Sequence, residues 1–114
     1  MIWRLGQRRD LDEVARRGRR VAAGPLWLRY LADPPAATPD PPRVAFAVGR
    51  KVGNAVIRNR LRRRLRELLR RQAGRPDRLP AGRYLLGAGP GAATASFADL
   101  ERWLEELFER MDRA

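Results

Sequence analysis

Cysteine and histidine are both missing from this chain of 114 residues, and a single lysine, Lys51, stands among its 25 basic residues. The lack of cysteine excludes disulfides and thiolate zinc sites. The lack of histidine removes the commonest general base and the commonest metal ligand. No stretch of 18 uncharged apolar residues occurs either, which excludes a membrane-spanning helix. The composition therefore argues against an enzyme that works by itself.

The chain does contain enough apolar material for a folded domain. A hydrophobic fraction of 44% in 114 residues predicts a single domain over residues 1–114 with a modest core. The first ten residues, MIWRLGQRRD, contain no apolar signal core, so we expect a cytoplasmic protein.

Positive charge is concentrated in the middle of the chain. Residues 43–71 carry eleven basic residues and one acid, Glu67, which is a net charge of +10 out of +12 for the whole chain. Residues 94–114 carry six acids and three basic residues. A GC-rich genome explains the excess of arginine over lysine but not its position. A charge run is usually a solvated face, but such faces mix signs, so we expect this one to bind a polyanion.

Hydrophobic periodicity and turn residues predict six elements in the order helix, strand, strand, helix, strand, helix. They are a helix that begins at Asp10 and stops at Gly18, strands over 26–31 and 43–49, a helix capped by Asn54, a strand over 83–86 and a helix opened by the capping box Ser96–Asp99. Five prolines in residues 33–42 predict a solvated hairpin connection between the first two strands. This order is typical of a small α/β layer fold.

In the strand over 43–49, large and small side chains alternate. Val44, Phe46 and Val48 lie on one side, and Ala45 and Ala47 on the other. Two explanations are open: the small side chains face a groove, or both faces of the strand are buried.

The basic helix has one apolar stripe, made of Ile57, Leu61, Leu65, Leu68 and Leu69. Most of its arginines fan over the remaining arc. Arg58 falls close to the stripe but lies in the first turn, so we expect it to point past the end of the core. A phosphate held there would gain from both Arg58 and the positive end of the helix dipole.

The acids of the last helix allow two interpretations. Glu101, Glu105 and Glu109 recur every four residues and in principle gather Mg²⁺. We favour a solvated acidic face, supported by the pair Glu106–Arg110 at i,i+4 spacing.

Residues 51–60 read Lys-Val-Gly-Asn-Ala-Val-Ile-Arg-Asn-Arg, and residues 61–67 continue Leu-Arg-Arg-Arg-Leu-Arg-Glu. This segment closely resembles the signature of the protein subunit of bacterial ribonuclease P, and the likeness extends over about residues 8–110. The resemblance implies a two-layer α/β sandwich of order α-β-β-α-β-α with a small, mostly antiparallel sheet. It also implies a left-handed β-α-β crossover through the basic helix, against the usual right-handed rule.

The resemblance also implies a function. The family's partner is a large catalytic RNA, expected in a 1:1 complex, and together they remove the 5′ leader from precursor tRNA. The activity is that of an endoribonuclease, a hydrolase, whose catalytic centre and Mg²⁺ ions belong to the RNA. For the protein it implies no catalytic residue and no cofactor, and leaves open whether the protein binds metal. We expect no DNA and no membrane partner.

By position in the motif, the resemblance assigns contacts with the catalytic RNA to Lys51, Arg58, Asn59, Arg60, Arg62, Arg63, Arg64 and Arg66. Among these, Arg62, Arg64 and Arg66 are expected to help through their charge. For Asn59 two roles are open: a contact with RNA, or a hydrogen bond that fixes a neighbouring arginine or the backbone.

A cleft between the first helix and the sheet is expected to hold the leader, with Leu11, Ala15, Trp27, Arg29, Ala45, Ala47 and Arg50 as its residues. The chain departs from the family here. Leu11 and Ala15 stand where relatives commonly have aromatics, Arg29 aligns with a strand aromatic, and Gly89 with an arginine. Trp27 is expected to stack on a leader base while Arg29 binds a phosphate or takes a cation–π role. Alternatively, Trp27 packs with Trp3 beneath the N-terminal segment.

Three other functions compete with this one. A generic basic RNA-binding protein of ribosomal type would carry the same charge without an enzymatic role. A DNA-binding transcription factor would be expected to have a helix and a short turn before the basic helix. A membrane-surface helix would need its Leu and Ile stripe for lipid, whereas the core needs it here.

Overall fold

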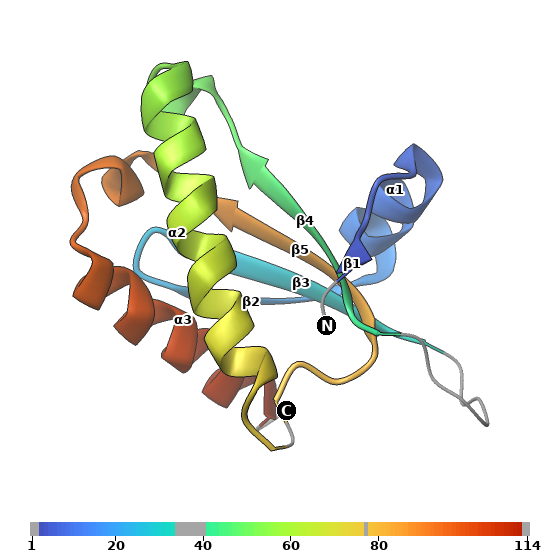
Figure 1. Ribbon diagram of the computed structural model, residues 1–114. Coiled ribbons are helices and arrows are strands. Elements are labelled where there is room, and N and C mark those ends of the chain that lie inside the picture. Colours follow the sequence, from blue (N-terminus) through green and yellow to red (C-terminus); the bar gives the residue numbers. More distant parts are fainter. Residues whose placement is uncertain (1–2, 34–40, 77, 113–114) are drawn as a thin grey trace.

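The computed structural model describes residues 3–33, 41–76 and 78–112, without the side chain of Trp3. In this part of the chain a five-stranded sheet is combined with three α-helices and two short 3-10 turns (Figure 1). The elements are β1 (Trp3–Arg4), α1 (Arg8–Arg17), β2 (Arg19–Ala23), β3 (Leu26–Ala32), β4 (Arg43–Val48), η1 (Arg50–Val52), α2 (Ala55–Ala73), β5 (Gly82–Ala88), η2 (Pro90–Thr94) and α3 (Phe97–Asp112).

The main core lies between one face of the sheet and the helices α2 and α3. Alternation along β5 sends Tyr84 and Leu86 into this core, where they are fully buried with residues of both helices. Arg83, which precedes Tyr84, points the other way and contacts α1. The expected α/β sandwich is therefore confirmed, with α1 covering part of the second face of the sheet (Figure 1).

The strand order is β1-β4-β5-β3-β2. The longest ladder joins β3 and β5 antiparallel, β2 pairs antiparallel with β3, and β4 adds parallel pairing with β1 and β5. The expected hairpin between the strands over 26–31 and 43–49 is wrong, because β5 is inserted between them. Residues 34–40 of the proline-rich connection lie outside the described residues.

The crossover from β4 through α2 to β5 is left-handed, as the family resemblance implied. In Figure 1, α2 lies in front of the sheet, and β5 lies to the left of β4 when the two parallel strands point upward. A right-handed connection would place the second strand on the right. This crossover lays the basic helix along the sheet near its β4 edge.

Local helix signals were mostly correct. The Asn54 side chain accepts a hydrogen bond from the Ile57 amide at 3.0 Å, and the Ser96 hydroxyl accepts one from the Asp99 amide at 3.0 Å. Asp10 is not the N-cap of the first helix, however. That helix begins at Arg8, and Asp10 lies in its first turn, where its carboxylate binds Arg83 instead of a backbone amide. Strand β2, which begins with two arginines, was not expected.

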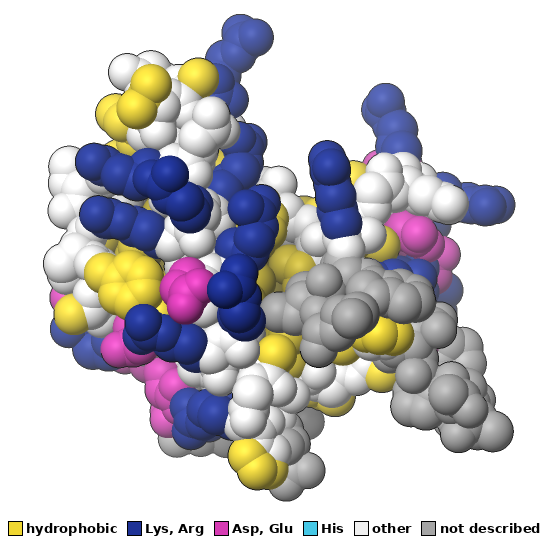
Figure 2. Space-filling view, viewed as in Figure 1, with side chains coloured by type: hydrophobic (Ala, Val, Ile, Leu, Met, Phe, Trp, Pro, Cys, Tyr) yellow, Lys and Arg dark blue, Asp and Glu magenta, His cyan; other side chains and the backbone are white. Residues whose placement is uncertain are grey.

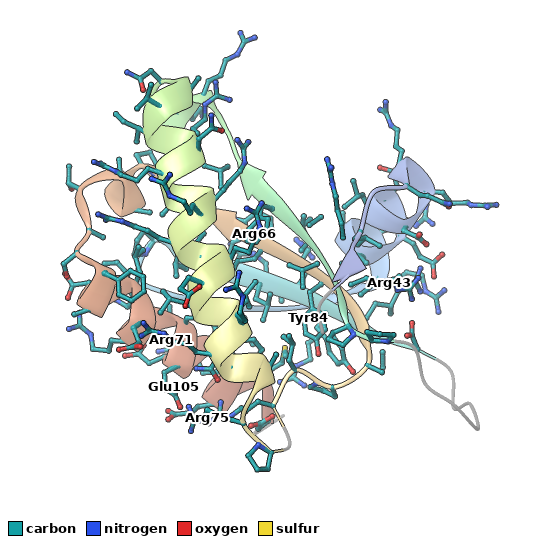
Figure 3. The ribbon with its side chains drawn as sticks, viewed as in Figure 1. Arg43, Arg66, Arg71, Arg75, Tyr84 and Glu105 are labelled. Atoms are coloured by element: carbon teal, nitrogen blue, oxygen red, sulfur yellow. The ribbon has the colours of Figure 1, made fainter. Side chains whose placement is uncertain are left out.

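The acidic helix α3 holds the C-terminal end of α2 and the segment after it. Glu105 accepts a hydrogen bond from Arg75 at 2.7 Å (Figure 3). It also accepts one from Gln72 at 2.7 Å and one from Arg78 at 3.2 Å. These donors, Arg75 foremost, hold the pKa of the Glu105 carboxyl below its ordinary value of 4.5. The expected pair Glu106–Arg110 is present at 3.7 Å, but the acidic face as a whole is not merely solvated.

Protonation of Glu105 should therefore destabilise the protein. Because the pKa of Glu105 is lower in the folded state, its contribution is complete above pH 4.5 and is lost as the pH falls through the lowered value. At pH 7 we expect Glu105→Gln to cost about 1 kcal/mol of unfolding free energy. The variant should also lose less stability than the wild type between neutral and acid pH, measured by urea unfolding.

The matched control is Glu109→Gln on the same helix. Glu109 is exposed and forms no salt bridge within the described ranges. Its substitution should leave the acid sensitivity of the wild type in place, and equal acid sensitivity of all three proteins would contradict the assignment.

Candidate nucleic-acid interface

The positive charge of α2 is divided into two parts at Glu67. Arg70 pairs with Glu67 at 3.1 Å, and Arg71 pairs with Glu101 at 3.1 Å. By contrast, none of the eight basic residues from Arg50 to Arg66 forms a salt bridge with a carboxylate in the described parts of the chain. The uncompensated charge thus belongs to the N-terminal half of the helix and to the turn before it. Basic side chains gather along α2 on the face shown in Figure 2.

The start of α2 is built by the turn η1 and the Asn54 cap. Lys51 is exposed in this turn, and Gly53 follows with a φ of 156°, where a side chain would press against Ile57. Arg58 is half-buried in the first turn of the helix, and its Nε atom is buried without a hydrogen-bond partner among the described residues. Among the cations of the motif, Arg58 is thus the one whose Nε is buried without a hydrogen-bond partner in the described chain.

Asn59 and Arg62 form a local hydrogen-bonded pair. Asn59 Oδ1 accepts from Arg62 Nη1 at 3.2 Å, and Arg62 Nη2 donates to the Val48 carbonyl at 3.3 Å. Of the two roles considered for Asn59, the one that fixes a neighbouring arginine is present in this structure. The pair ties the second turn of α2 to the end of β4.

A groove of about 660 Å³ lies beside the outer edge of β4. One wall comes from α1 and the segment before it, including Leu5 and Leu11, and the other from α2, where Arg62, Arg66 and Arg70 recur every four residues. Strand β1 pairs with β4 only at Arg43 and Val44, so it covers only the beginning of this edge. In Figure 2 the surface is hollowed between the basic side chains of α2 and the region of α1.

The groove combines residues that sequence reasoning assigned to two different surfaces. Leu11 and Ala45 were expected in the leader cleft, whereas Arg62 and Arg66 were assigned to the catalytic RNA, yet all four line this one groove. Sequence reasoning missed Arg4, Phe46 and Arg70 as lining residues. The spacing of Arg70 with Arg62 and Arg66 was a readable signal; nothing local marked Arg4. The Arg66 guanidinium lies 5.7 Å from the centre of the Phe46 ring.

The other expected cleft residues lie outside the lining of this groove, and they are Ala15, Trp27, Arg29, Ala47 and Arg50. Ala15 and Arg50 are exposed, on α1 and in η1 respectively. Trp27, Arg29 and Ala47 share the sheet face opposite the main core, as the pairing register of β3, β4 and β5 requires.

Trp27 lies flat across the neighbouring strand. A Cβ atom added at Gly87 would lie 2.0 Å from the indole Cε2, so the absence of a side chain there makes room for the ring. The Arg20 guanidinium also lies over the ring, 5.7 Å from its centre. The alternative in which Trp27 packs with Trp3 involves a side chain outside the description. The half-buried indole is thus held against the sheet by contacts that do not require Trp3.

Two further features concern metals and membranes. Within residues 3–33, 41–76 and 78–112, no group of three or more acidic side chains is arranged so that it could hold a metal ion. No helix of the described chain is sufficiently long and apolar to cross a membrane.

Comparison with known proteins decides the family. The sequence profile of the family described as Ribonuclease P matches residues 2–112. The chain belongs to this family. It is 44% identical over 110 residues to the ribonuclease P protein component of Acidothermus cellulolyticus, with 96% of this chain and 88% of that protein covered. The protein component of Brucella suis is 41% identical over 116 residues, covering 96% and 78% respectively.

Solved structures of this family share the fold. The RNase P protein of Staphylococcus aureus superimposes with a TM-score of 0.83 at 21% identity, covering 96% of this chain and 94% of that one. The RNase P protein of Thermotoga maritima gives a TM-score of 0.78 at 22% identity, covering 94% and 96%. At this level of identity the likeness concerns the architecture, and the side chains of the interface must be judged on this chain alone.

Proposed function

We propose that this protein is the protein subunit of ribonuclease P, which binds the catalytic RNA and the 5′ leader of precursor tRNA and assists removal of the leader. The observation that carries the proposal is the motif over 51–67. Its cations up to Arg66 have no acidic partner in the described chain, and the chain belongs to the Ribonuclease P family. Catalysis in the complex belongs to the RNA and its Mg²⁺ ions. The protein contributes affinity and alignment, which suits a chain without histidine or cysteine.

The exposed cations at the N-terminal half of α2 and in the turn before it bind the catalytic RNA in this proposal. Lys51, Arg60 and Arg63 are exposed and free to meet phosphates, and Arg64 is half-buried nearby. The buried Nε of Arg58 has no partner in the described chain, so a phosphate oxygen at the start of the helix would satisfy it. Each phosphate neutralised in this way releases counterions, so the affinity should fall steeply with salt.

The leader is received on the other side of α2, in the groove and on the adjoining sheet face. Arg62 and Arg66 supply charge along one wall of the groove, and Leu11 supplies apolar contact on the other. Trp27 offers an aromatic surface for an unpaired base in place of the aromatics that relatives carry on the first helix. Arg62 and Arg66 therefore serve the leader in this proposal, rather than the catalytic RNA as their place in the motif suggested.

A DNA-binding role is disfavoured by the element order, because β4 and the turn η1 precede α2 where a helix-turn-helix protein has a helix. A generic RNA-binding protein would have the same kind of cationic surface. It is distinguished from a ribonuclease P subunit by its lack of effect on precursor-tRNA cleavage. Mixed with a bacterial ribonuclease P RNA at low Mg²⁺, the protein should accelerate cleavage of precursor tRNA at the mature 5′ end. Binding of that RNA without any stimulation of cleavage would leave the generic RNA-binding function as the correct one.

The division of charge on α2 predicts unequal effects for two exposed arginines. Arg63→Ala should weaken binding of the catalytic RNA and reduce the slope of log affinity against log salt by about 1, because it removes one phosphate contact. Arg71→Ala should change both much less, because Glu101 already neutralises Arg71. Titrations of the labelled RNA at several salt concentrations measure both quantities. Equal losses for the two variants would contradict the division.

Removal of the Trp27 ring should weaken binding of the leader selectively. In the reconstituted complex, Trp27→Ala should lower the affinity for precursor tRNA about five- to hundredfold, because a base–aromatic stack contributes about 1–3 kcal/mol. The affinity for mature tRNA, which has no leader, should stay the same. Trp27→Phe is the matched variant that keeps an aromatic face, and it should retain most of the preference. An unchanged preference in Trp27→Ala would remove Trp27 from the leader site.

A further inference from the structure

Helix α1 is attached to the sheet by unusually few apolar contacts. Its sequence is RRDLDEVARR, and within this helix, which the structure describes completely, Val14 is the one fully buried residue. Leu11 is half-buried because it faces the groove. One buried valine is a weak anchor for a helix of ten residues, so its position must depend on other contacts.

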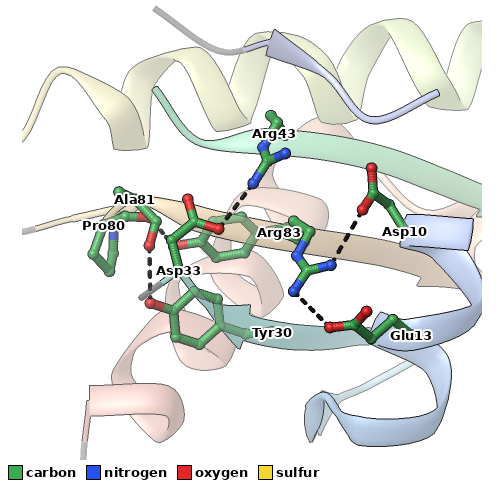
Figure 4. A network of polar contacts seen from close by, with 9 residues as sticks. Asp10, Glu13, Tyr30, Asp33, Arg43, Pro80, Ala81 and Arg83 are labelled. Atoms are coloured by element: carbon green, nitrogen blue, oxygen red, sulfur yellow. Dashed lines mark hydrogen bonds and ion pairs between the residues drawn. The ribbon is translucent and has the colours of Figure 1, made fainter. Parts of the chain in front are cut away.

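Those contacts come from Arg83 on β5. Its Nη1 lies 3.2 Å from Asp10 Oδ1, and its Nη2 lies 2.9 Å from Glu13 Oε1 (Figure 4). Asp10 and Glu13 are three residues apart, so they lie on the same side of α1 and are bridged by a single guanidinium. The Arg83 side chain is only 13% exposed, so this triad is shielded from solvent far more than the surface pairs of α2. The guanidinium accordingly lowers the pKa of the Glu13 carboxyl.

The triad has a fixed base, because β5 is paired on both edges, with β3 and with β4. A guanidinium on this strand cannot follow α1 if the helix moves away. Leu11, next to Asp10 in sequence, forms the α1 wall of the groove, across from Arg62 and Arg66. The triad thus fixes the α1 wall of the groove relative to the sheet. The opposite wall, α2, is packed on the same sheet.

Arg83 also changes the electrostatics of this wall. Asp10 and Glu13 would otherwise present two carboxylates beside a groove that is lined on its far side by arginines. Glu13 has a second partner, Arg17, at 3.4 Å, but that arginine is largely exposed and contributes little. For Asp10, Arg83 is the one salt-bridge partner within the described residues. Loss of Arg83 would therefore both free the helix and place negative charge where a phosphate backbone has to pass.

We propose that Arg83 is a positioning residue for substrate: by binding Asp10 and Glu13 it holds α1 as the second wall of the groove and so permits a single-stranded leader to bind. This inference rests on the proposed function, because it takes the occupant of the groove to be RNA. Arg83 itself faces the carboxylates and need not touch the leader.

The chain offers a matched control for Arg83. Arg43 is its direct neighbour on β4 in the pairing register, and it forms a similar shielded ion pair, with Asp33 at 2.8 Å. That pair does not involve α1 (Figure 4). Arg43→Gln therefore removes a comparable ion pair from the same row of the sheet without releasing the helix.

The experiment compares the wild type, Arg83→Gln and Arg43→Gln, each reconstituted with ribonuclease P RNA. Arg83→Gln should bind precursor tRNA about three- to tenfold more weakly, the range for one or two shielded charge pairs. Its affinities for mature tRNA and for the catalytic RNA should be unchanged. In the free protein, amides of α1 should exchange hydrogen faster in Arg83→Gln than in the wild type, while those of α2 keep their protection. Arg43→Gln should match the wild type in precursor preference and in α1 exchange.

Two further variants keep the test decisive if Arg83→Gln fails to fold. The double variant Asp10→Asn/Glu13→Gln removes the same triad from the helix side and should lose the precursor preference in the same way. The single variant Asp10→Asn leaves the pair of Glu13 and Arg83 in place and should lose only part of the preference.

The proposal is overturned if Arg83→Gln and the double variant keep the precursor preference, or if Arg43→Gln loses it equally. A wild-type protein that does not stimulate cleavage at all would refute the proposed function, and with it the role of the triad in leader binding. A wild type that is active, with Arg83→Gln equally selective, would refute the positioning role alone.

Discussion

The central position of β5 is the constraint on which the rest of the structure depends. This strand pairs antiparallel with β3 and parallel with β4, so its side chains alternate between two well-defined environments. Tyr84 and Leu86 enter the core beneath α2 and α3, where the Tyr84 ring stacks on Tyr30 with 4.7 Å between centroids. Arg83 and Gly87 point to the opposite face, where one holds α1 and the other makes room for Trp27. A single strand therefore contributes core residues to one face of the sheet and the contacts with α1 and Trp27 to the other.

Helices α2 and α3 together divide the charge of the protein. The apolar stripe of α2 is buried on the sheet, and α3 packs against the C-terminal half of α2 with its acids directed at Arg71, Arg75 and Arg78. Each such pair at the surface contributes little free energy. Their larger effect is to cancel positive charge at one end of α2 and to leave it at the other. The uncompensated positive charge of α2 is therefore highest near the turn η1, which is where a polyanion would be attracted most strongly.

Helix α2 has one side that faces the groove beside β4 and another side that faces solvent. Arg62, Arg66 and Arg70 share a groove with Leu5 and Leu11, whereas Arg63 is exposed to solvent. One basic helix can thus present two surfaces to RNA at once. In this chain helix α1 contributes Leu11 to the groove, and the Trp27 ring lies on the adjoining sheet face, 5.7 Å from the Arg20 guanidinium.

Sequence alone determined the parts of this protein that depend on neighbouring residues. The Asn54 and Ser96 caps, the apolar stripe of α2 and the motif over 51–67 could be recognised because each lies within a few helical turns. Tertiary structure decided what depends on long-range pairing: the insertion of β5 between β3 and β4, the left-handed crossover, and the bond from Arg83 to Asp10 across 73 residues. Asp10 illustrates the difference, since its local pattern is that of a helix cap. The largely shielded guanidinium of Arg83 on β5 binds its carboxylate instead, because a shielded charge requires a partner more strongly than an exposed helix end requires a cap.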